Sequence, residues 1–230
     1  MENKKICIIY WGLIRGFKLD FVFNSHKKYL YDNLISKNID FDIFVVTNNV
    51  DYDETNINKI PNLKLLKIIN VDEIHNLDEY KKAYKNICFT TPGWCDYFHK
   101  NLLVVYYNKQ QLASIIPNNY YKYISMDIGN LINNFDLSLI NTELNFSSSH
   151  ETSCGINPRI LIGDYNCIFA ELNKFNTILN YDIPLVVLNP ESFLTTYFGN
   201  KKIVINDTHL IEVLRVRADG TNQNGIKYIC

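Results

Sequence analysis

Short apolar runs alternate with a helical segment over the first 70 residues, and this alternation limits the folds open to the chain. Residues 5–10 form a run rich in β-branched side chains that ends near a glycine, and residues 41–47 and 63–70 form two more such runs. Between the first two runs, residues 17–36 place apolar side chains at helical spacing. This order is typical of α/β proteins with a parallel sheet. We therefore expect a mostly parallel sheet flanked by helices.

The same kinds of pattern continue toward the C-terminus. Apolar runs predict strands at 121–126, 158–163, 203–205 and 210–216, and helical spacing predicts helices at 99–116, 164–179 and 190–197. The polar, serine-rich stretch 145–151 is typical of a loop. With no internal repeat and no linker composition, we expect one domain over 1–218 and a turn-rich C-terminal tail over 219–230.

Composition excludes several classes of protein. The 230 residues are 47% apolar and carry a formal charge of −1, which is enough apolar material for a packed core and argues against disorder. The basic residues are scattered in a neutral chain, so we expect no nucleic-acid partner. No window is long and apolar enough to predict a membrane span, and no secretory signal pattern opens the chain. The six cysteines lack C-x-x-C or zinc-ligand spacing, which predicts a reduced, cytoplasmic protein.

The first candidate site follows the first predicted strand. In open α/β sheets, ligands bind beyond the carboxyl ends of the strands. There Gly12 would let the backbone approach a ligand closely, and Arg15 would suit a phosphate. The segment is neither a G-x-G-x-x-G fingerprint nor a Walker A loop, so a plain strand–helix turn with a surface arginine fits equally well.

The second candidate is Asp127, at the end of the strand predicted over 121–126. A carboxylate in this place suits Mg²⁺ or Mn²⁺ shared with phosphate oxygens. The second acid of a D-x-D pair would fall at Gly129, which has no side chain, and Asn130 is a weaker neutral ligand. A strand-terminal turn aspartate is the alternative interpretation.

Two further acids and two arginines complete the candidates. Asp164 and Glu191 each suit a general base, or equally an acid at a helix N-terminus that the helix dipole favours. Arg215 and Arg217 alternate along a predicted strand and therefore point the same way. They would clamp a diphosphate or pair with surface carboxylates.

Taken in order, these segments resemble a family of small glycosyltransferases with a GT-A-like fold, encoded in bacterial polysaccharide loci and in large DNA viruses. The stretch Ile-Ile-Tyr-Trp-Gly-Leu-Ile-Arg is similar to the family's opening strand, and Phe-Asp-Ile-Phe-Val-Val-Thr to its second strand. The strand ending at Asp127 is similar to an R-x-D strand end, although Tyr123 and Ser125 stand near the expected arginines. Residues 157–163 are similar to an Asn-Asp-Arg-Phe-x-x-Gly segment, with Pro158 after Asn157. Residues 189–191 are similar to a His-Pro-Glu element that begins here with Asn189.

The resemblance implies transfer of a sugar from a nucleotide diphosphate donor, a UDP- or GDP-sugar, to a glycan, protein or other hydroxyl acceptor. It implies that Asp127 holds a metal–diphosphate, with Mn²⁺ or Mg²⁺ as the ion, and that Glu191 or Asp164 activates the acceptor. The nucleotide-sugar site that it implies consists of Gly12, Arg15, Thr47, Asn48 and Arg159.

Two other classes of function fit the same chain. A non-catalytic α/β module that binds a nucleotide or glycan is consistent with the incomplete D-x-D pair. A different nucleotide-dependent enzyme, such as a methyltransferase, fits less well, because no glycine-rich loop follows the first strand.

Overall fold

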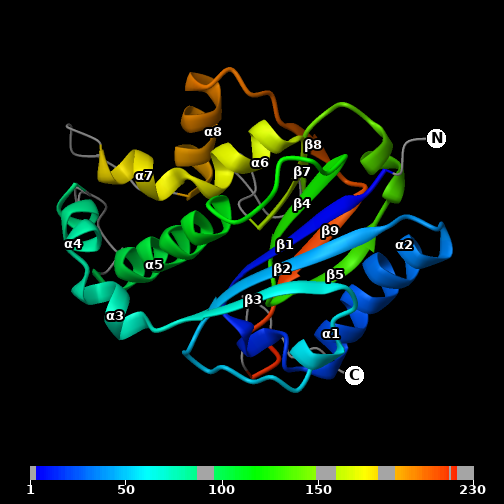
Figure 1. The fold of residues 1–230 in the computed structure, drawn as a ribbon, viewed down its shortest axis with the longest axis horizontal. Coiled ribbons are helices and arrows are strands. Elements are labelled where there is room, and N and C mark those ends of the chain that lie inside the picture. The colour runs from blue at the N-terminus through cyan, green and yellow to red at the C-terminus, as the bar shows by residue number, and fades with distance from the viewer. Residues whose placement is uncertain (1–3, 87–95, 149–158, 181–189, 218, 222–230) are drawn as a thin grey trace.

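The computed structural model describes residues 4–86, 96–148, 159–180, 190–217 and 219–221. Within them, a seven-stranded sheet has the order β3-β2-β1-β4-β7-β6-β8, and a separate ribbon pairs β5 with β9 (Figure 1). The strands of the sheet are β1 (Ile6–Gly12), β2 (Phe41–Asn48), β3 (Leu63–Ile69), β4 (Lys122–Asp127), β6 (Phe146–Ser148), β7 (Ile160–Gly163) and β8 (Asn206–Thr208). The ribbon consists of β5 (Asn130–Phe135) and β9 (Ile211–Arg215).

Four neighbouring strands form the parallel part of the sheet. β1 pairs in parallel with β2 on one side and with β4 on the other, and β2 pairs in parallel with β3. Their carboxyl ends therefore meet at one edge, where Gly12 stands opposite Thr47 and Trp11 stands opposite Asp127. The predicted mostly parallel sheet flanked by helices is confirmed.

Beyond β4 the sheet changes direction. β7 runs antiparallel to β4, and β6 runs antiparallel to β7, while β8 pairs in parallel with β6. Met126, near the end of β4, stands opposite Ile160 at the start of β7. The beginning of β7, and not its end, therefore lies at the edge where β1, β2 and β4 finish.

Helices lie on both sides of the sheet (Figure 1). One side carries α1 (Asp20–His26), a π-helical turn η2 (Lys27–Tyr31) and α2 (Asp32–Ser36), which together continue one helical segment. The other side carries α3 (Val71–Asn76), α4 (Asp78–Lys85), α5 (Asp96–Ala113), α6 (Tyr165–Leu172), α7 (Lys174–Leu179) and α8 (Pro190–Asn200). Short 3-10 turns occur at η1 (Ile14–Gly16), η3 (Ile57–Lys59) and η4 (Leu137–Asn141). No helix in the described ranges combines the length and apolar character that crossing a membrane requires.

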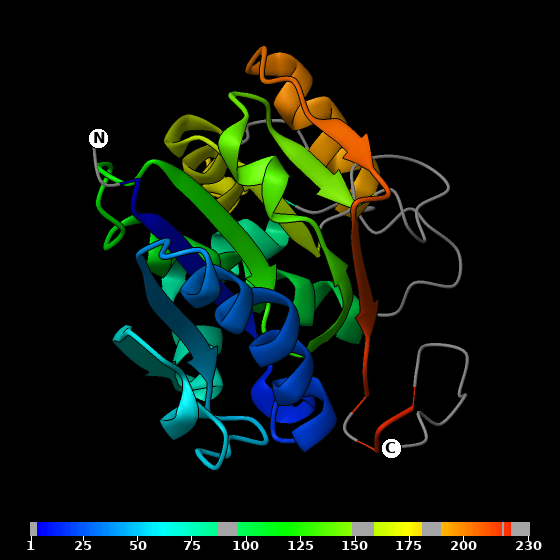
Figure 2. The same cartoon turned by 90° about the vertical axis from the view of Figure 1, so that its right-hand side faces the viewer.

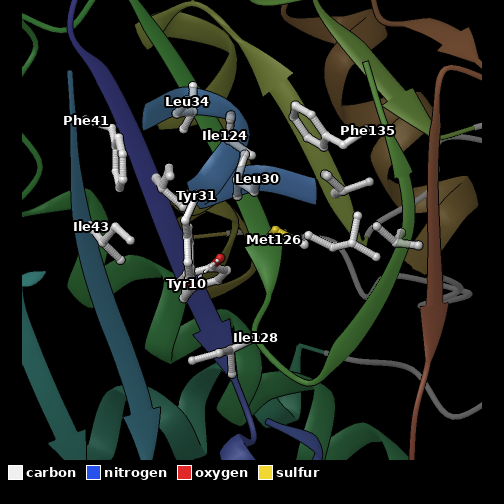
Figure 3. Close-up of a cluster of buried hydrophobic side chains, with 14 of the residues drawn as sticks. Tyr10, Leu30, Tyr31, Leu34, Phe41, Ile43, Ile124, Met126, Ile128 and Phe135 are labelled. Carbon is white, nitrogen blue, oxygen red and sulfur yellow. Dashed lines mark hydrogen bonds between the residues drawn. The ribbon is translucent and has the colours of Figure 1, made fainter. Parts of the chain in front are cut away.

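The alternation of side chains along β1 explains why helices pack on both faces of the sheet. Ile8 and Tyr10 pack with the α1–α2 side, whereas Cys7 and Ile9 pack with the α5–α7 side. Every residue of β1 is buried, as expected for a central parallel strand. Figure 3 shows the first of these layers, in which Tyr10 and Tyr31 lie among aliphatic side chains from β2, β4 and the helical segment.

Some expected elements differ from the structure. Part of the predicted loop 145–151 forms β6, whose residues are all buried against neighbouring strands. Residues 203–205 are not a strand, and the pairing begins at Asn206 instead. The helical spacing of apolar residues over 17–36 predicts a core position for Ile35, but this side chain is 55% exposed. Cys7 and Cys167 are buried free thiols, as the apolar sequence around them indicates, and burial raises the pKa of both.

Candidate functional site

Asp127 ends β4 at the edge where the parallel strands finish. Its backbone N–H donates to the carbonyl of Arg159 at 3.0 Å, and its carboxylate Oδ1 accepts from the backbone N–H of Gly129 at 3.0 Å. The side chain is thus fixed by its own turn and stands beside the start of β7.

Gly12 provides the space for this carboxylate. A Cβ at position 12 would lie 2.7 Å from Asp127 Oδ1, and the backbone there has φ +97°, a conformation that favours glycine. Thr47, which has no exposed surface, donates from its hydroxyl to the Gly12 carbonyl at 2.9 Å. The glycine that was expected to admit a ligand also admits the Asp127 side chain, and Thr47 holds it in place.

The turn that carries Arg15 packs directly on the Asp127 turn. A Cβ on Gly16 would lie 2.7 Å from the Gly129 carbonyl oxygen, and a Cβ on Gly129 would lie 3.1 Å from the carbonyl oxygen of Leu13. Backbone meets backbone here because both positions are glycine. The half-buried Arg15, in the loop after β1, therefore lies on the turn that packs against the Asp127 turn, and its charge acts on Arg215.

The other arginines reach the same place from later strands. Arg159 directly precedes β7, whose antiparallel direction brings its start to Asp127. Arg215, the last residue of β9, stands opposite Asn130, which begins β5 three residues after Asp127. Arg217 follows two residues later. In Figure 2, β9 runs down one side of the molecule alongside β5 toward the α1 region.

The four arginines of the chain thus lie near one another around Arg215, and Arg215 and Arg159 act on Asp127, although the chain holds 19 lysines that are spread over its length. Burial lowers the pKa of Arg215, and the like charges of Arg159, Arg15 and Arg217 lower it further, against the opposing effect of Asp127. Burial raises the pKa of Asp127, while the Gly129 hydrogen bond and the charges of Arg215, Lys109 and Arg159 act in the other direction. Among the described residues, basic side chains outnumber acidic ones at this site, with Asp127 at the strand end and Asp219 near Arg217.

A buried ionic layer lies beneath it on the α5–α7 side. Glu171 of α6 accepts hydrogen bonds from both Lys109 of α5 and Lys174, and all three side chains are at most 1% exposed. The Lys109 ammonium stands 3.4 Å from the ring centre of Trp11, the neighbour of Gly12. Burial lowers the pKa of Lys109 to about 7, although Glu171 opposes the shift. The charges of Lys109 and Lys174 outweigh the effect of burial on Glu171 and hold the pKa of its carboxyl below the ordinary value.

A series of buried hydrogen bonds supports the site from the α1–α2 side. His26 Nε2 lies 2.6 Å from the Asn130 carbonyl oxygen, and Nδ1 lies 2.8 Å from the Tyr10 hydroxyl, which in turn lies 2.9 Å from the Tyr31 hydroxyl. Burial lowers the pKa of His26 to about 4, so the ring is neutral near pH 7. A carbonyl only accepts, so Nε2 carries the proton and Nδ1 accepts from Tyr10. These hydrogen bonds hold the start of β5, the strand that follows the Asp127 turn.

The remaining predicted residues lie in different places. Asn48 ends β2 at the same edge, where its side-chain oxygen accepts from the Val50 N–H at 3.1 Å. Asp164 is the N-cap of α6, accepting from the Cys167 N–H at 2.7 Å, and it follows the far end of β7. It comes five positions after Arg159, with the four residues of β7 between them, which is a span of roughly 16 Å. Glu191 belongs to the first turn of α8. The sequence Pro-Gly-Trp at 92–94 also offers the Trp94 ring for stacking on a sugar or base, or as a core or lid anchor, and Trp94 lies outside the described residues.

The donor set at Asp127 is a poor match for a resident divalent cation. Mg²⁺ and Mn²⁺ prefer several oxygen ligands, including one or two carboxylates. Here one carboxylate is surrounded by guanidinium and ammonium groups, and the described residues contain no cluster of three His, Cys, Asp or Glu side chains suited to a metal. A second acid in place of Gly129 would put its Cβ 3.1 Å from the Leu13 carbonyl oxygen. The residues present do not fit a metal held by the protein alone.

Two parts of the site were not singled out from the sequence. Lys109 with Glu171, and His26 with Tyr10, join segments far apart in the chain, so no local pattern marks them. Arg215 and Arg217 were considered for a diphosphate but could not be placed beside Arg15. The chain has four arginines and 19 lysines, and this low number of arginines is the sequence signal that would have set them apart as one group.

Comparisons with known proteins were made for both the sequence and the structure of the chain. No family model matches the sequence, and no curated protein matches it. Among solved structures, mouse xyloside xylosyltransferase 1 in its apo form aligns over 89% of this chain and 85% of that chain, with 6% identity and a TM-score of 0.44. At that identity and score, the likeness assigns no activity to this chain.

Proposed function

We propose that the chain binds a nucleotide diphosphate sugar at the carboxyl edge of β1, β2 and β4 and transfers the sugar to a hydroxyl acceptor. The observation that carries this proposal is the grouping of the four arginines around Arg215, beside Asp127. Arginine forms paired hydrogen bonds with phosphate oxygens, and the carboxyl edge is where open α/β sheets bind ligands. The resemblance of the sequence to small glycosyltransferases supports the same function.

In this proposal, each part of the site has its own role. Arg15, Arg159 and Arg215 contact the diphosphate, and Gly12 and Thr47 shape the adjoining backbone. Asn48, at the end of the neighbouring strand, faces the nucleoside. In an inverting transfer, the acceptor oxygen bonds to the anomeric carbon while the bond from that carbon to the diphosphate oxygen breaks. Glu191 receives the acceptor proton, and the arginines stabilise the negative charge on the departing nucleoside diphosphate.

Glu191 is preferred over Asp164 as the base because of where Asp164 lies. Asp164 caps α6 at the opposite end of β7 from Arg159, and its carboxylate already accepts from the helix. A base must come within hydrogen-bond reach of the acceptor hydroxyl, directly or through one water.

The test combines binding with turnover. We expect calorimetric titration with a panel of UDP- and GDP-sugars to find a donor that binds, and expect release of nucleoside diphosphate once an acceptor is supplied. Glu191→Gln should abolish turnover and leave donor affinity unchanged. A chain that binds a donor but transfers or hydrolyses nothing under any condition is the non-catalytic binding module instead, which the glycine at position 129 also fits. Failure to bind any nucleotide would contradict both.

A further inference from the structure

The charge balance of the site bears on how it neutralises a diphosphate. Arg15, Arg159 and Arg217 lie near Arg215, which lies beside Asp127, and below them is the paired layer of Lys109, Lys174 and Glu171. Within the described residues, these basic side chains stand against the carboxylates of Asp127, Glu171 and Asp219, the last of which interacts with Arg217. The net charge of these groups is positive before any ligand binds, so the site attracts an anion and repels a divalent cation.

At this edge of the sheet, Asp127 is the described carboxylate that a metal could use, and it is already engaged. Asp127 Oδ1 accepts from the Gly129 N–H, and the charges of Arg215, Lys109 and Arg159 act on the same group. Gly129 stands where a second acid would be needed, and backbone contacts on either side leave little room for a side chain there. Asp127 is therefore placed as a counter-ion that orders the arginines.

We infer that Arg15, Arg159 and Arg215 bind the donor diphosphate directly, and that donor binding needs no divalent cation. This inference rests on the proposed nucleotide-sugar function and specifies how the same site recognises its substrate. The planar guanidinium presents two parallel N–H donors to a phosphate, a match that a lysine ammonium cannot make. Three such groups arriving from three separate segments enclose the diphosphate from different directions.

The deciding experiment titrates the full chain with inorganic pyrophosphate and with UDP- and GDP-sugars, once in excess EDTA and once in excess Mn²⁺. We expect the dissociation constants under the two conditions to agree within about threefold. Binding that is about tenfold or more tighter with Mn²⁺, or that is seen only with it, overturns the inference while leaving the proposed function standing. Failure of pyrophosphate and every nucleotide to bind under both conditions overturns both.

Charge and shape are then separated with variants in EDTA. Arg215→Lys keeps the charge and should weaken pyrophosphate binding about tenfold, and Arg215→Gln should weaken it further. The matched control is Lys37→Gln, which removes an exposed cation just before β2, at the opposite edge of the sheet, and should change nothing. Equal affinity of Arg215→Gln and the parent would overturn the direct contact.

If Asp127 is a counter-ion, Asp127→Asn should have one effect on binding, and if it is a metal ligand, the opposite effect. The amide keeps the shape and the oxygen that accepts from Gly129, but it removes a negative charge. A counter-ion role predicts pyrophosphate binding in EDTA at least as tight as in the parent. A metal-ligand role predicts loss of a Mn²⁺-dependent component, and that result would overturn the inference. Circular dichroism and thermal unfolding confirm that each variant is folded.

Discussion

Gly12 and Asp127 share one space: a Cβ on the glycine would lie 2.7 Å from the Oδ1 atom of the aspartate. β1 and β4 are neighbours in the sheet, and the carboxylate at the end of one strand folds over the last residue of the other. The position of this acid beside Arg159 and Arg215 thus depends on the absence of a side chain on the next strand.

Gly12→Ala should therefore damage both stability and binding. The positive φ of +97° costs a non-glycine residue about 1–3 kcal/mol, and the Cβ must also displace Asp127. We expect a loss of about 2 kcal/mol or more in urea unfolding, together with weaker pyrophosphate binding. Gly199→Ala is the matched control: it lies in α8 with nothing within 4 Å of the added Cβ, and should be neutral or slightly stabilising. Similar unfolding curves for the two variants would contradict the close approach at Gly12.

The buried ionic layer should be far more sensitive than an exposed ion pair. Glu171→Gln leaves Lys109 and Lys174 buried without a counter-charge, which should cost about 3–5 kcal/mol of unfolding free energy. Asp32→Asn removes an exposed ion pair, in which Asp32 Oδ2 lies 2.7 Å from Lys27 Nζ, and should cost less than about 1 kcal/mol of unfolding free energy. Denaturant titration of the two variants measures the contrast, and a cost for Glu171→Gln as small as for Asp32→Asn would exclude a buried charged triad.

His26 makes stability depend on pH. Its pKa is lowered from 6.5 to about 4 by burial, so the folded state holds the neutral ring while the unfolded chain takes up a proton below the ordinary value. This contribution is complete above pH 6.5 and is lost as the pH falls toward 4. We expect about 2 kcal/mol of the unfolding free energy to be lost between about pH 7.5 and about pH 5.

The matching variant is His26→Gln, measured by urea unfolding at the same two pH values. It keeps hydrogen-bonding groups near the Asn130 carbonyl and Tyr10 but cannot titrate. Its stability should be lower overall and should change less with pH than that of the parent. An unchanged pH dependence in this variant would mean that other groups are responsible.

Asp164 separates a structural role from a catalytic one. Asp164→Ala removes the N-cap of α6 and should cost about 1 kcal/mol of stability while leaving donor turnover intact. Asp164→Ser, which can still cap, should recover most of that loss. If turnover disappeared in both variants although they remained folded, Asp164 and not Glu191 would become the candidate base.

The local pattern of apolar residues was sufficient to predict much of the fold. The strands at 6–12, 41–48, 63–69 and 122–127 lie within two residues of their predicted bounds at each end, because each is a compact apolar run, and those at 6–12 and 41–48 are buried throughout. β5 and β6 are not predicted because half or more of the residues in their short sequences, Asn130–Phe135 and Phe146–Ser148, are polar. Their pairing depends on β9, β7 and β8, which are distant in the chain.

By itself, the sequence determined that the chain forms a mostly parallel α/β sheet and that Gly12, Arg15 and Asp127 follow strands whose carboxyl ends meet. Only the tertiary structure decided which charges gather there. The antiparallel direction of β7 brings Arg159 to Asp127 and takes Asp164 to the other edge, and the β5–β9 ribbon adds Arg215. Strand direction is set by long-range pairing, which no local pattern of side chains encodes.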